Sequence, residues 1–148
     1  MNKFLSNVVE LFTPYKLTEA EDPLLIKERE YASAAVIQFT DFTSCIGVIA
    51  KEGSTLTAVH LVAASGEKKL HVFNTIDAVN VTGRLPKDPD AVTIVGYIDI
   101  WRNHEDNGKL AAAFQKLTSS FTKLEIQQRE GTLRAEINGA GKIVVSNV

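Results

Sequence analysis

Cys45 and His60 are the residues whose types and spacing suggest chemistry. Cys45 is the only cysteine of the chain, and a free thiol is only a few per cent ionised near neutral pH. A neighbouring imidazole can take the thiol proton and leave a thiolate, which is the nucleophile. The imidazolium formed in that step can then protonate a leaving amine. The two residues are therefore candidates for nucleophilic attack on an amide.

A β-hairpin is the element expected to position the two side chains. Residues 45–50 (CIGVIA) and 55–63 (TLTAVHLVA) have the pattern of strands, with Lys51-Glu52-Gly53-Ser54 between them. A two-residue loop of Glu52-Gly53 would place Cys45 directly opposite His60. Their Cβ atoms would then be about 4.5–5.5 Å apart. A shift of the register by one residue would move one partner to the other face.

The segment just before this hairpin is expected to supply backbone donors. The N–H groups around Thr43, Ser44 and Cys45 are candidates to stabilise an oxyanion. In a regular strand the side chain of Ser44 points away from that of Cys45, so its hydroxyl is a poor candidate nucleophile. The small residues Gly47 and Ala58 leave open space beside the pair.

An ordinary structural role is the alternative for both residues. A lone cysteine in an apolar strand is most often a small buried hydrophobe, and a strand histidine is often a surface residue or a satisfied core residue. On this interpretation the chain is a non-catalytic protein-interaction domain. Phe39, Phe42 and Trp101 would then belong to a binding face.

The composition fits one soluble globular domain. The chain has 148 residues, of which 45% are hydrophobic and 23% charged, and its formal net charge is -2. No strongly basic surface is implied, so nucleic-acid binding is disfavoured. No apolar run is long enough to cross a bilayer. The N-terminal residues lack the features of a Sec signal peptide, so we expect a cytoplasmic protein or an effector that is secreted without a Sec signal.

Metal and cofactor chemistry are not expected. One cysteine excludes an internal disulfide and the cysteine-rich zinc signatures. The three histidines, His60, His71 and His104, do not have the i, i+4 spacing of a helical metal site. The spacing of apolar residues places His71 on a strand surface and Asp99 at a solvent-facing strand position.

The order of elements predicts an α+β fold. We expect an antiparallel-rich β-sandwich or sheet, with one long helix and shorter additional helices, in a single domain over residues 1–148. Residues 1–30 would form an N-terminal helix and a loop, and residues 31–148 the core. Asn74 or Thr75 is expected to cap the second helix, and Asn103 the third. The periodicity predicts helices over 2–12, 76–82 and 105–120, and strands over 33–39, 45–50, 55–63, 69–73, 91–101, 123–129, 132–138 and 142–147.

The segment Thr43-Ser44-Cys45-Ile46-Gly47-Val48, followed by His60, resembles the Gly-Ser-Cys…His core of the CheD family of glutamine deamidases. The interval from Cys45 to His60 is also similar to that of the cytotoxic necrotizing factor catalytic domain. The order of the downstream elements extends the resemblance to about residues 34–148. The glycines that precede Ser-Cys in CheD are replaced here by residues such as Asp41.

The resemblance implies a thiol-dependent protein-glutamine deamidase with CheD-like layering, either a housekeeping enzyme or a toxin or effector. Cys45 and His60 would be catalytic, no cofactor would be needed, and the partner would be a protein substrate with a reactive glutamine. In CheD an active-site threonine precedes the cysteine. Phe39 occupies that position here, so the adjacent Thr40 is the candidate third member. In the necrotizing-factor group a backbone carbonyl can orient the histidine instead.

Overall fold

A computed structural model describes residues 15–65, 71–103 and 108–148 of the chain. Three helices lie in this part, α2 (Thr75–Thr82), α3 (Ile98–Asn103) and α4 (Lys109–Ser119). The strands are β1 (Thr18–Glu19), β2 (Glu30–Ala34), β3 (Val36–Gln38), β4 (Ile46–Glu52), β5 (Thr55–Leu61), β6 (Ala64–Ser65), β7 (His71–Val72), β8 (Ala91–Gly96), β9 (Leu124–Gln128), β10 (Leu133–Ile137) and β11 (Ile143–Asn147). The fold is a mixed α+β fold in which sheets dominate.

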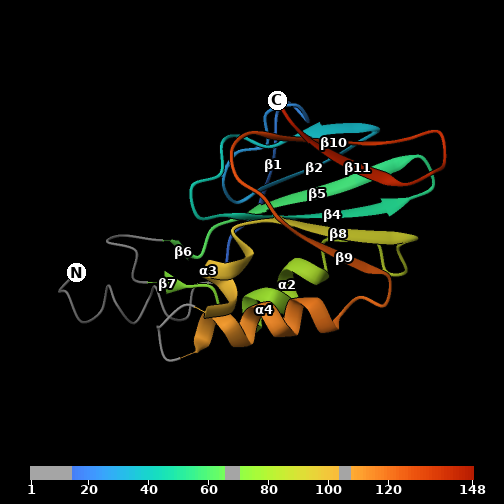
Figure 1. The fold of residues 1–148 in the computed structure, drawn as a ribbon. Coiled ribbons are helices and arrows are strands. Elements are labelled where there is room, and N and C mark those ends of the chain that lie inside the picture. Colours follow the sequence, from blue (N-terminus) through green and yellow to red (C-terminus); the bar gives the residue numbers. More distant parts are fainter. Residues whose placement is uncertain (1–14, 66–70, 104–107) are drawn as a thin grey trace.

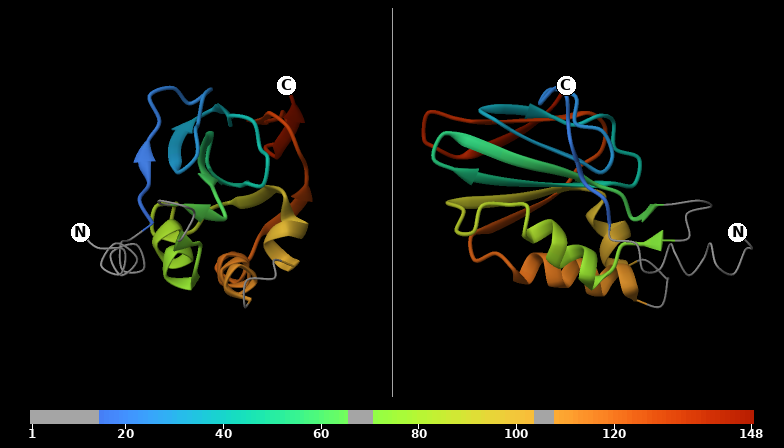
Figure 2. Two further views of the ribbon diagram at one scale, coloured as in Figure 1. Left: turned by 90° about the vertical axis from the view of Figure 1, so that its left-hand side faces the viewer. Right: turned by 180° about the vertical axis from the view of Figure 1, so that it is seen from behind.

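The elements form three layers (Figure 1). A six-stranded sheet of order β1-β2-β5-β4-β8-β9 lies in the middle. The three-stranded sheet β11-β10-β3 covers one face of it, and α2 and α4 lie against the other face (Figure 2). The central strands pair antiparallel, whereas β8 and β9 pair parallel through a connection that contains α3 and α4.

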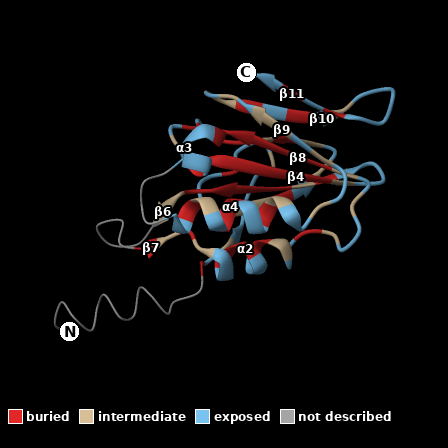
Figure 3. Ribbon diagram, turned by 60° about the horizontal axis from the view of Figure 1, so that its bottom comes forward, coloured by how far each residue is buried: buried red, intermediate tan, exposed pale blue. Residues whose placement is uncertain are grey.

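Burial follows this layering. The first five residues of β4 are all buried, as expected for a strand covered on both faces. Figure 3 shows that α2 and α4 turn buried residues toward the sheet and exposed residues outward. On the face that is turned to the small sheet, Gly47 leaves room for an aromatic ring. A Cβ atom at this position would lie 2.5 Å from Cζ of Phe39.

The capped helix α2 confirms the helix predicted over residues 76–82. Asn74 is its N-cap, and its side chain accepts from the N–H of Asp77, whose own carboxylate accepts from the N–H of Asn74. Helix α4 runs over Lys109–Ser119, shorter than the predicted 105–120, and residues 104–107 lie outside the described part. Asn103 ends α3 and does not cap α4, whose N-cap is Gly108.

Two of the predicted strands are wrong in extent. The strand predicted over 91–101 ends at Gly96, and α3 begins at Ile98. The reason is the backbone of Gly96, whose φ of 126° is one that other residues rarely adopt. The strand predicted over 33–39 is divided at Ala35, and its two halves pair in different sheets. The predicted helix over 2–12 lies outside the described residues.

Several residues that the sequence placed at the surface are buried. Phe39, Phe42 and Trp101 are 1%, 1% and 0% exposed, so they belong to the core and form no binding face. His71 is also buried, with its Nε2 atom 2.7 Å from a carboxylate oxygen of Asp77. Asp99 is exposed as expected, but in the first turn of α3 and not on a strand.

Candidate active site at Cys45 and His60

Cys45 directly precedes β4, and the alternation of that strand assigns it to the face of Gly47 and His60, but Cys45 and His60 are not directly opposite each other. Glu52 pairs with Thr55 around a Gly53-Ser54 loop, which places His60 opposite Gly47. The predicted pairing of Cys45 with His60 is therefore wrong by two residues. Because a shift of two preserves the face, Cys45 is a diagonal neighbour of His60. Such neighbours have Cα atoms about 7–8 Å apart, within reach of an aromatic side chain.

The hydrogen bond of His60 to a carbonyl fixes its tautomer. Nδ1 lies 2.9 Å from the backbone oxygen of Ile26, which can only accept, so Nδ1 carries the proton. Nε2 is then the atom with a free lone pair. It is buried and has no hydrogen-bond partner among the described residues. A buried, unpaired ring nitrogen is costly in a core that does not use it.

The surroundings of His60 keep the imidazole neutral. Burial lowers the pKa of His60 below its usual value. The hydrogen bond to Ile26 and the charges of Glu28 and Glu30 oppose that shift, with smaller effects. The rings of Phe39 and Phe42 confine the imidazole at centroid distances of 5.6 and 4.7 Å. A neutral imidazole with Nε2 unprotonated is the form that can accept a thiol proton.

Thr40 reaches the same side of the imidazole as Ile26. Its Oγ1 lies 3.5 Å from Nδ1 of His60 and 3.4 Å from the oxygen of Ile26. In a regular strand Thr40 would point to the opposite face from its neighbour Phe39. Thr40 follows β3 and is outside any regular strand, so this alternation does not apply to it. Both distances are at the long end for hydrogen bonds. Thr40 is a weak support for His60, and the carbonyl of Ile26 is the stronger one.

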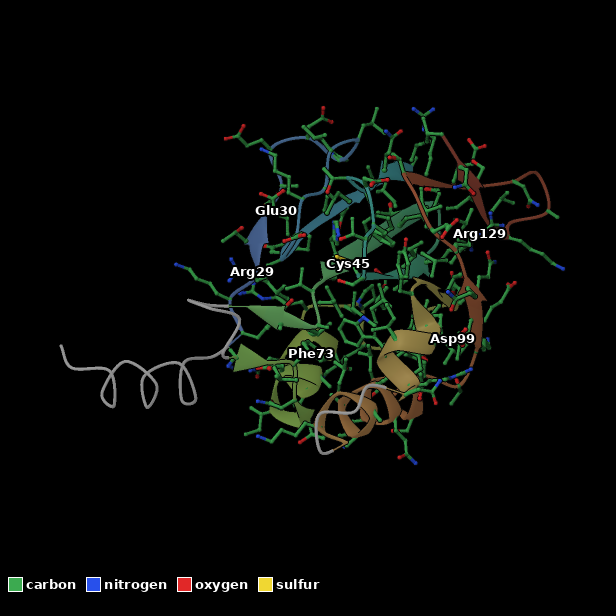
Figure 4. The ribbon with its side chains drawn as sticks, turned by 60° about the vertical axis from the view of Figure 1, so that its left-hand side comes forward. Arg29, Glu30, Cys45, Phe73, Asp99 and Arg129 are labelled. Atoms are coloured by element: carbon green, nitrogen blue, oxygen red, sulfur yellow. The ribbon has the colours of Figure 1, made fainter. Side chains whose placement is uncertain are left out.

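In Figure 4 Cys45 lies near the middle of the view, between the labelled Arg29 and Glu30 on one side and Asp99 and Arg129 on the other. Its side chain is buried, with 2% exposed. Sγ lies 4.0 Å from the carboxylate oxygen Oε1 of Glu28, a residue that is itself exposed. The side chain of Glu28 therefore reaches from an exposed segment of the chain to the buried thiol.

That segment is a tight turn over residues 27–30. The N–H of Glu30 donates to the carbonyl of Lys27 at 3.0 Å. Arg29 has a φ of 61° and is the one non-glycine residue with positive φ in the described part of the chain. Its N–H donates to the carbonyl of His60 at 2.7 Å. The positive φ of Arg29 costs about 1 kcal/mol or more in backbone strain. The turn that carries this strain contacts both Cys45 and His60.

Tyr97, which precedes α3, and Trp101 of α3 hold the backbone carbonyls of Cys45 and Ser44. The N–H of Tyr97 donates to the carbonyl of Cys45, and Nε1–H of Trp101 donates to the carbonyl of Ser44, both at 3.0 Å. The Ser44–Cys45 peptide bond is trans, so the N–H of Cys45 points away from Trp101. Gly96 permits this close approach, since a Cβ atom there would lie 2.4 Å from the oxygen of Cys45.

The residues proposed from the sequence as backbone support occupy the segment before β4. Thr43 is exposed and Ser44 is partly buried. Four other contributors were missed by the sequence analysis: Ile26, Glu28, Gly96 and Trp101. Only Gly96 had a usable signal, because a glycine inside a strand pattern often marks a close backbone approach. A carbonyl such as that of Ile26 leaves no mark in a sequence.

Within the described residues, no group of three or more His, Cys, Asp or Glu side chains is arranged to hold a metal ion. The same part of the chain contains no helix that is long and apolar enough to cross a membrane. The groups that the site offers for chemistry are the thiol, the imidazole and the backbone N–H groups. No protein-family model matches this chain, and a search of curated proteins finds no match either.

Proposed function

We propose that the chain is a thiol-dependent protein-glutamine deamidase, with Cys45 as nucleophile and His60 as base and then acid. The observation that carries the proposal is the tautomer of His60. The carbonyl of Ile26 holds Nδ1–H, and Nε2 is left buried without a hydrogen-bond partner among the described residues. The three-layered fold is compatible with the CheD-like layering that the sequence resemblance implies, and this layering is part of the proposal.

The reaction has two stages. Nε2 of His60 takes the thiol proton, and Sγ of Cys45 attacks the carbon of the glutamine side-chain amide. The resulting oxyanion is bound by backbone N–H groups at residues 43–45. As the C–N bond breaks, the imidazolium of His60 gives its proton to the nitrogen, and ammonia leaves. Water, deprotonated by His60, then hydrolyses the thioester to give glutamate and the free thiol.

Access to the thiol requires a movement at the surface. Cys45 is 2% exposed, and the carboxylate of Glu28 lies over its sulfur. Glu28 is exposed, so its side chain can swing aside without unpacking the core. A glutamine side chain on a protein substrate would enter by the position that Glu28 vacates. The substrate is a protein, met either in the cytoplasm or after delivery as an effector without a Sec signal.

The low exposure of Cys45 is also the observation that favours the second candidate. In that case Cys45 is core packing, and the chain is a non-catalytic interaction domain. The two functions differ in one measurable respect. A deamidase converts glutamine into glutamate and releases ammonia in amounts that exceed the amount of protein, whereas an interaction domain only binds.

The test is a comparison of wild type with Cys45→Ser in candidate cell lysates. Partners retained by Cys45→Ser are identified, and each is then incubated with wild type and searched for glutamine-to-glutamate conversion by mass spectrometry. We expect conversion at a defined glutamine with wild type, and none with Cys45→Ser or His60→Ala. Conversion that persists in Cys45→Ser contradicts the proposal. Binding by both proteins without any conversion favours the interaction domain.

A further inference from the structure

Glu28 is the charged side chain that a substrate group would contact as it approaches the thiol. Its carboxylate oxygen is 4.0 Å from Sγ of Cys45, and the residue is exposed on the 27–30 turn. Its turn neighbour Glu30 is engaged differently, because its Oε1 accepts from the N–H of Lys27. The position of Glu28 is set by the backbone of the turn, which is tied to the carbonyl of His60 through the N–H of Arg29.

Two other carboxylates act on a residue next to the site. Burial raises the pKa of Tyr97, and the nearby charges of Glu130 and Asp41 raise it further. The N–H of Tyr97 holds the carbonyl of Cys45, so these carboxylates lie near the residue that holds the Cys45 backbone. Arg29, on the same turn as Glu28, acts on a different group. Its guanidinium lowers the pKa of the Tyr15 hydroxyl, although burial has the larger effect and raises that pKa. Glu28 is therefore the charge that contacts the sulfur itself.

The buried Nε2 atom of His60 is a second, independent indication that a ligand group binds at this site. That nitrogen has no partner among the described residues, and its residue pairs with Gly47, which follows Cys45 by two positions. A carboxylate in contact with the thiol and a buried acceptor without a partner among the described residues together fit an amide group that enters beside a cation. The amide meets the thiol and the imidazole, and the cation meets Glu28.

We propose that Glu28 selects protein substrates in which a lysine or arginine side chain lies next to the target glutamine, an inference that rests on the proposed deamidase function. The cation replaces the thiol as the partner of the carboxylate. Glu28 then turns from Cys45 to the substrate, which opens the position over the sulfur and leaves the thiol proton to His60. A glutamine flanked by acidic residues is repelled by the same carboxylate.

The test measures charge selection at Cys45 without needing to know the substrate. Two methanethiosulfonate reagents of similar size are compared, one with a positively charged ammonium group and one with a negatively charged sulfonate. In both cases the thiolate of Cys45 attacks the reagent sulfur, a disulfide forms and methanesulfinate leaves. Each rate is divided by the rate of the same reagent with the guanidinium-unfolded chain. The ratio of the two normalised rates is independent of how much thiolate is present.

We expect wild type to prefer the cationic reagent by about fivefold or more. Two unit charges about 4 Å apart interact by about 1 kcal/mol in water, which corresponds to this change in rate. Glu28→Gln should lower that preference by at least about threefold. Glu21→Gln, which removes another exposed carboxylate outside the 27–30 turn, should keep it. A preference that is the same in wild type and Glu28→Gln overturns the inference, as does a wild-type preference for the anionic reagent.

Two glutamine peptides that differ only in the neighbouring residue, lysine or glutamate, extend the test to the reaction. Faster ammonia release from the lysine peptide, with the advantage lost in Glu28→Gln, supports the inference. Equal rates with the two peptides contradict it. If neither peptide is deamidated while the reagent ratio still responds to Glu28, the deamidase function is contradicted and the selection of positive charge at Cys45 remains established.

Discussion

The Nδ1 atom of His60 lies 2.9 Å from the backbone oxygen of Ile26, and this one bond decides which ring nitrogen carries the proton. A side-chain partner could be protonated or could rotate, whereas a carbonyl only accepts and is held by the chain. The segment that supplies this carbonyl continues into the 27–30 turn, which contacts both Cys45 and His60. The hydrogen bond that orients His60 and the carboxylate that contacts Cys45 therefore come from one short stretch of the chain.

The lowered pKa of His60 predicts a pH-dependent loss of stability. In the unfolded chain the imidazole takes a proton as the pH falls below about 6.5, but in the folded chain it does so only at lower pH. Protonation therefore favours the unfolded state in that window, and the free energy of unfolding falls with decreasing pH by up to about 1.4 kcal/mol per pH unit. Urea denaturation of wild type and His60→Asn between about pH 7 and pH 5 measures this. Asparagine keeps a donor but does not titrate, so its curve should be flatter. Parallel curves for the two proteins would show that His60 is not the titrating group.

Trp101→Phe should weaken the stabilisation of the oxyanion without changing the reactivity of the Cys45 thiol. The substitution removes the donor to the Ser44 carbonyl and should cost about 1–3 kcal/mol of stability, because a buried acceptor loses its partner. The N–H groups of the Ser44–Cys45 segment lose their anchor, so kcat for deamidation should fall by about tenfold to a hundredfold. Alkylation of Cys45 forms no oxyanion and should proceed at the wild-type rate. A folded Trp101→Phe protein with unchanged kcat would exclude this positioning role.

Gly96→Ala should destabilise the protein severely, whereas Gly139→Ala should not. At Gly96 a Cβ atom would lie 2.4 Å from the Cys45 oxygen, and the φ of 126° is itself unfavourable for alanine. We expect a loss of about 3 kcal/mol or more, through steric overlap and backbone strain. No atom lies within 4 Å of the corresponding position at Gly139, so that control should change stability by less than about 0.5 kcal/mol. Chemical denaturation of both variants gives the comparison, and equal stabilities would show that β8 does not approach Cys45 this closely.

Thr40 should contribute little to the proposed reaction. Its contacts to His60 and to the Ile26 carbonyl are 3.5 and 3.4 Å long, so Thr40→Val should reduce kcat by less than about threefold. Thr40→Ser keeps the hydroxyl and should behave as wild type. A much larger loss in Thr40→Val that serine restores would make Thr40, and not the carbonyl of Ile26, the main support of His60.

The sequence predicted the hairpin and the face shared by Cys45 and His60, because alternation in a strand survives an error of two residues in the register. It did not predict the turn itself, since both Glu52-Gly53 and Gly53-Ser54 are acceptable two-residue loops. Helix α2 was predicted well, because Asn74 and Asp77 form a capping box that is recognisable in the sequence. The strand expected through Trp101 was wrong, because apolar alternation continues past the point where Gly96 turns the backbone.

The contributions that the sequence could not supply are those that depend on distant segments. Ile26 and His60 are brought together where the 27–30 turn is tied to the hairpin, and no local pattern marks such a contact. The burial of Phe39, Phe42 and Trp101 depends on the second sheet and on α3. In the sequence an aromatic residue in a core looks the same as one on a binding face.

The activation of the thiol by His60 is tested most directly by alkylation with iodoacetamide. Because Cys45 is the only cysteine, the labelling rate reports on that residue alone. We predict that at about pH 7 the native protein reacts several-fold faster than the unfolded chain, and that His60→Ala loses this advantage. Equal labelling of wild type and His60→Ala, both slower than the unfolded chain, would show that Cys45 is an inert part of the core and would contradict the account.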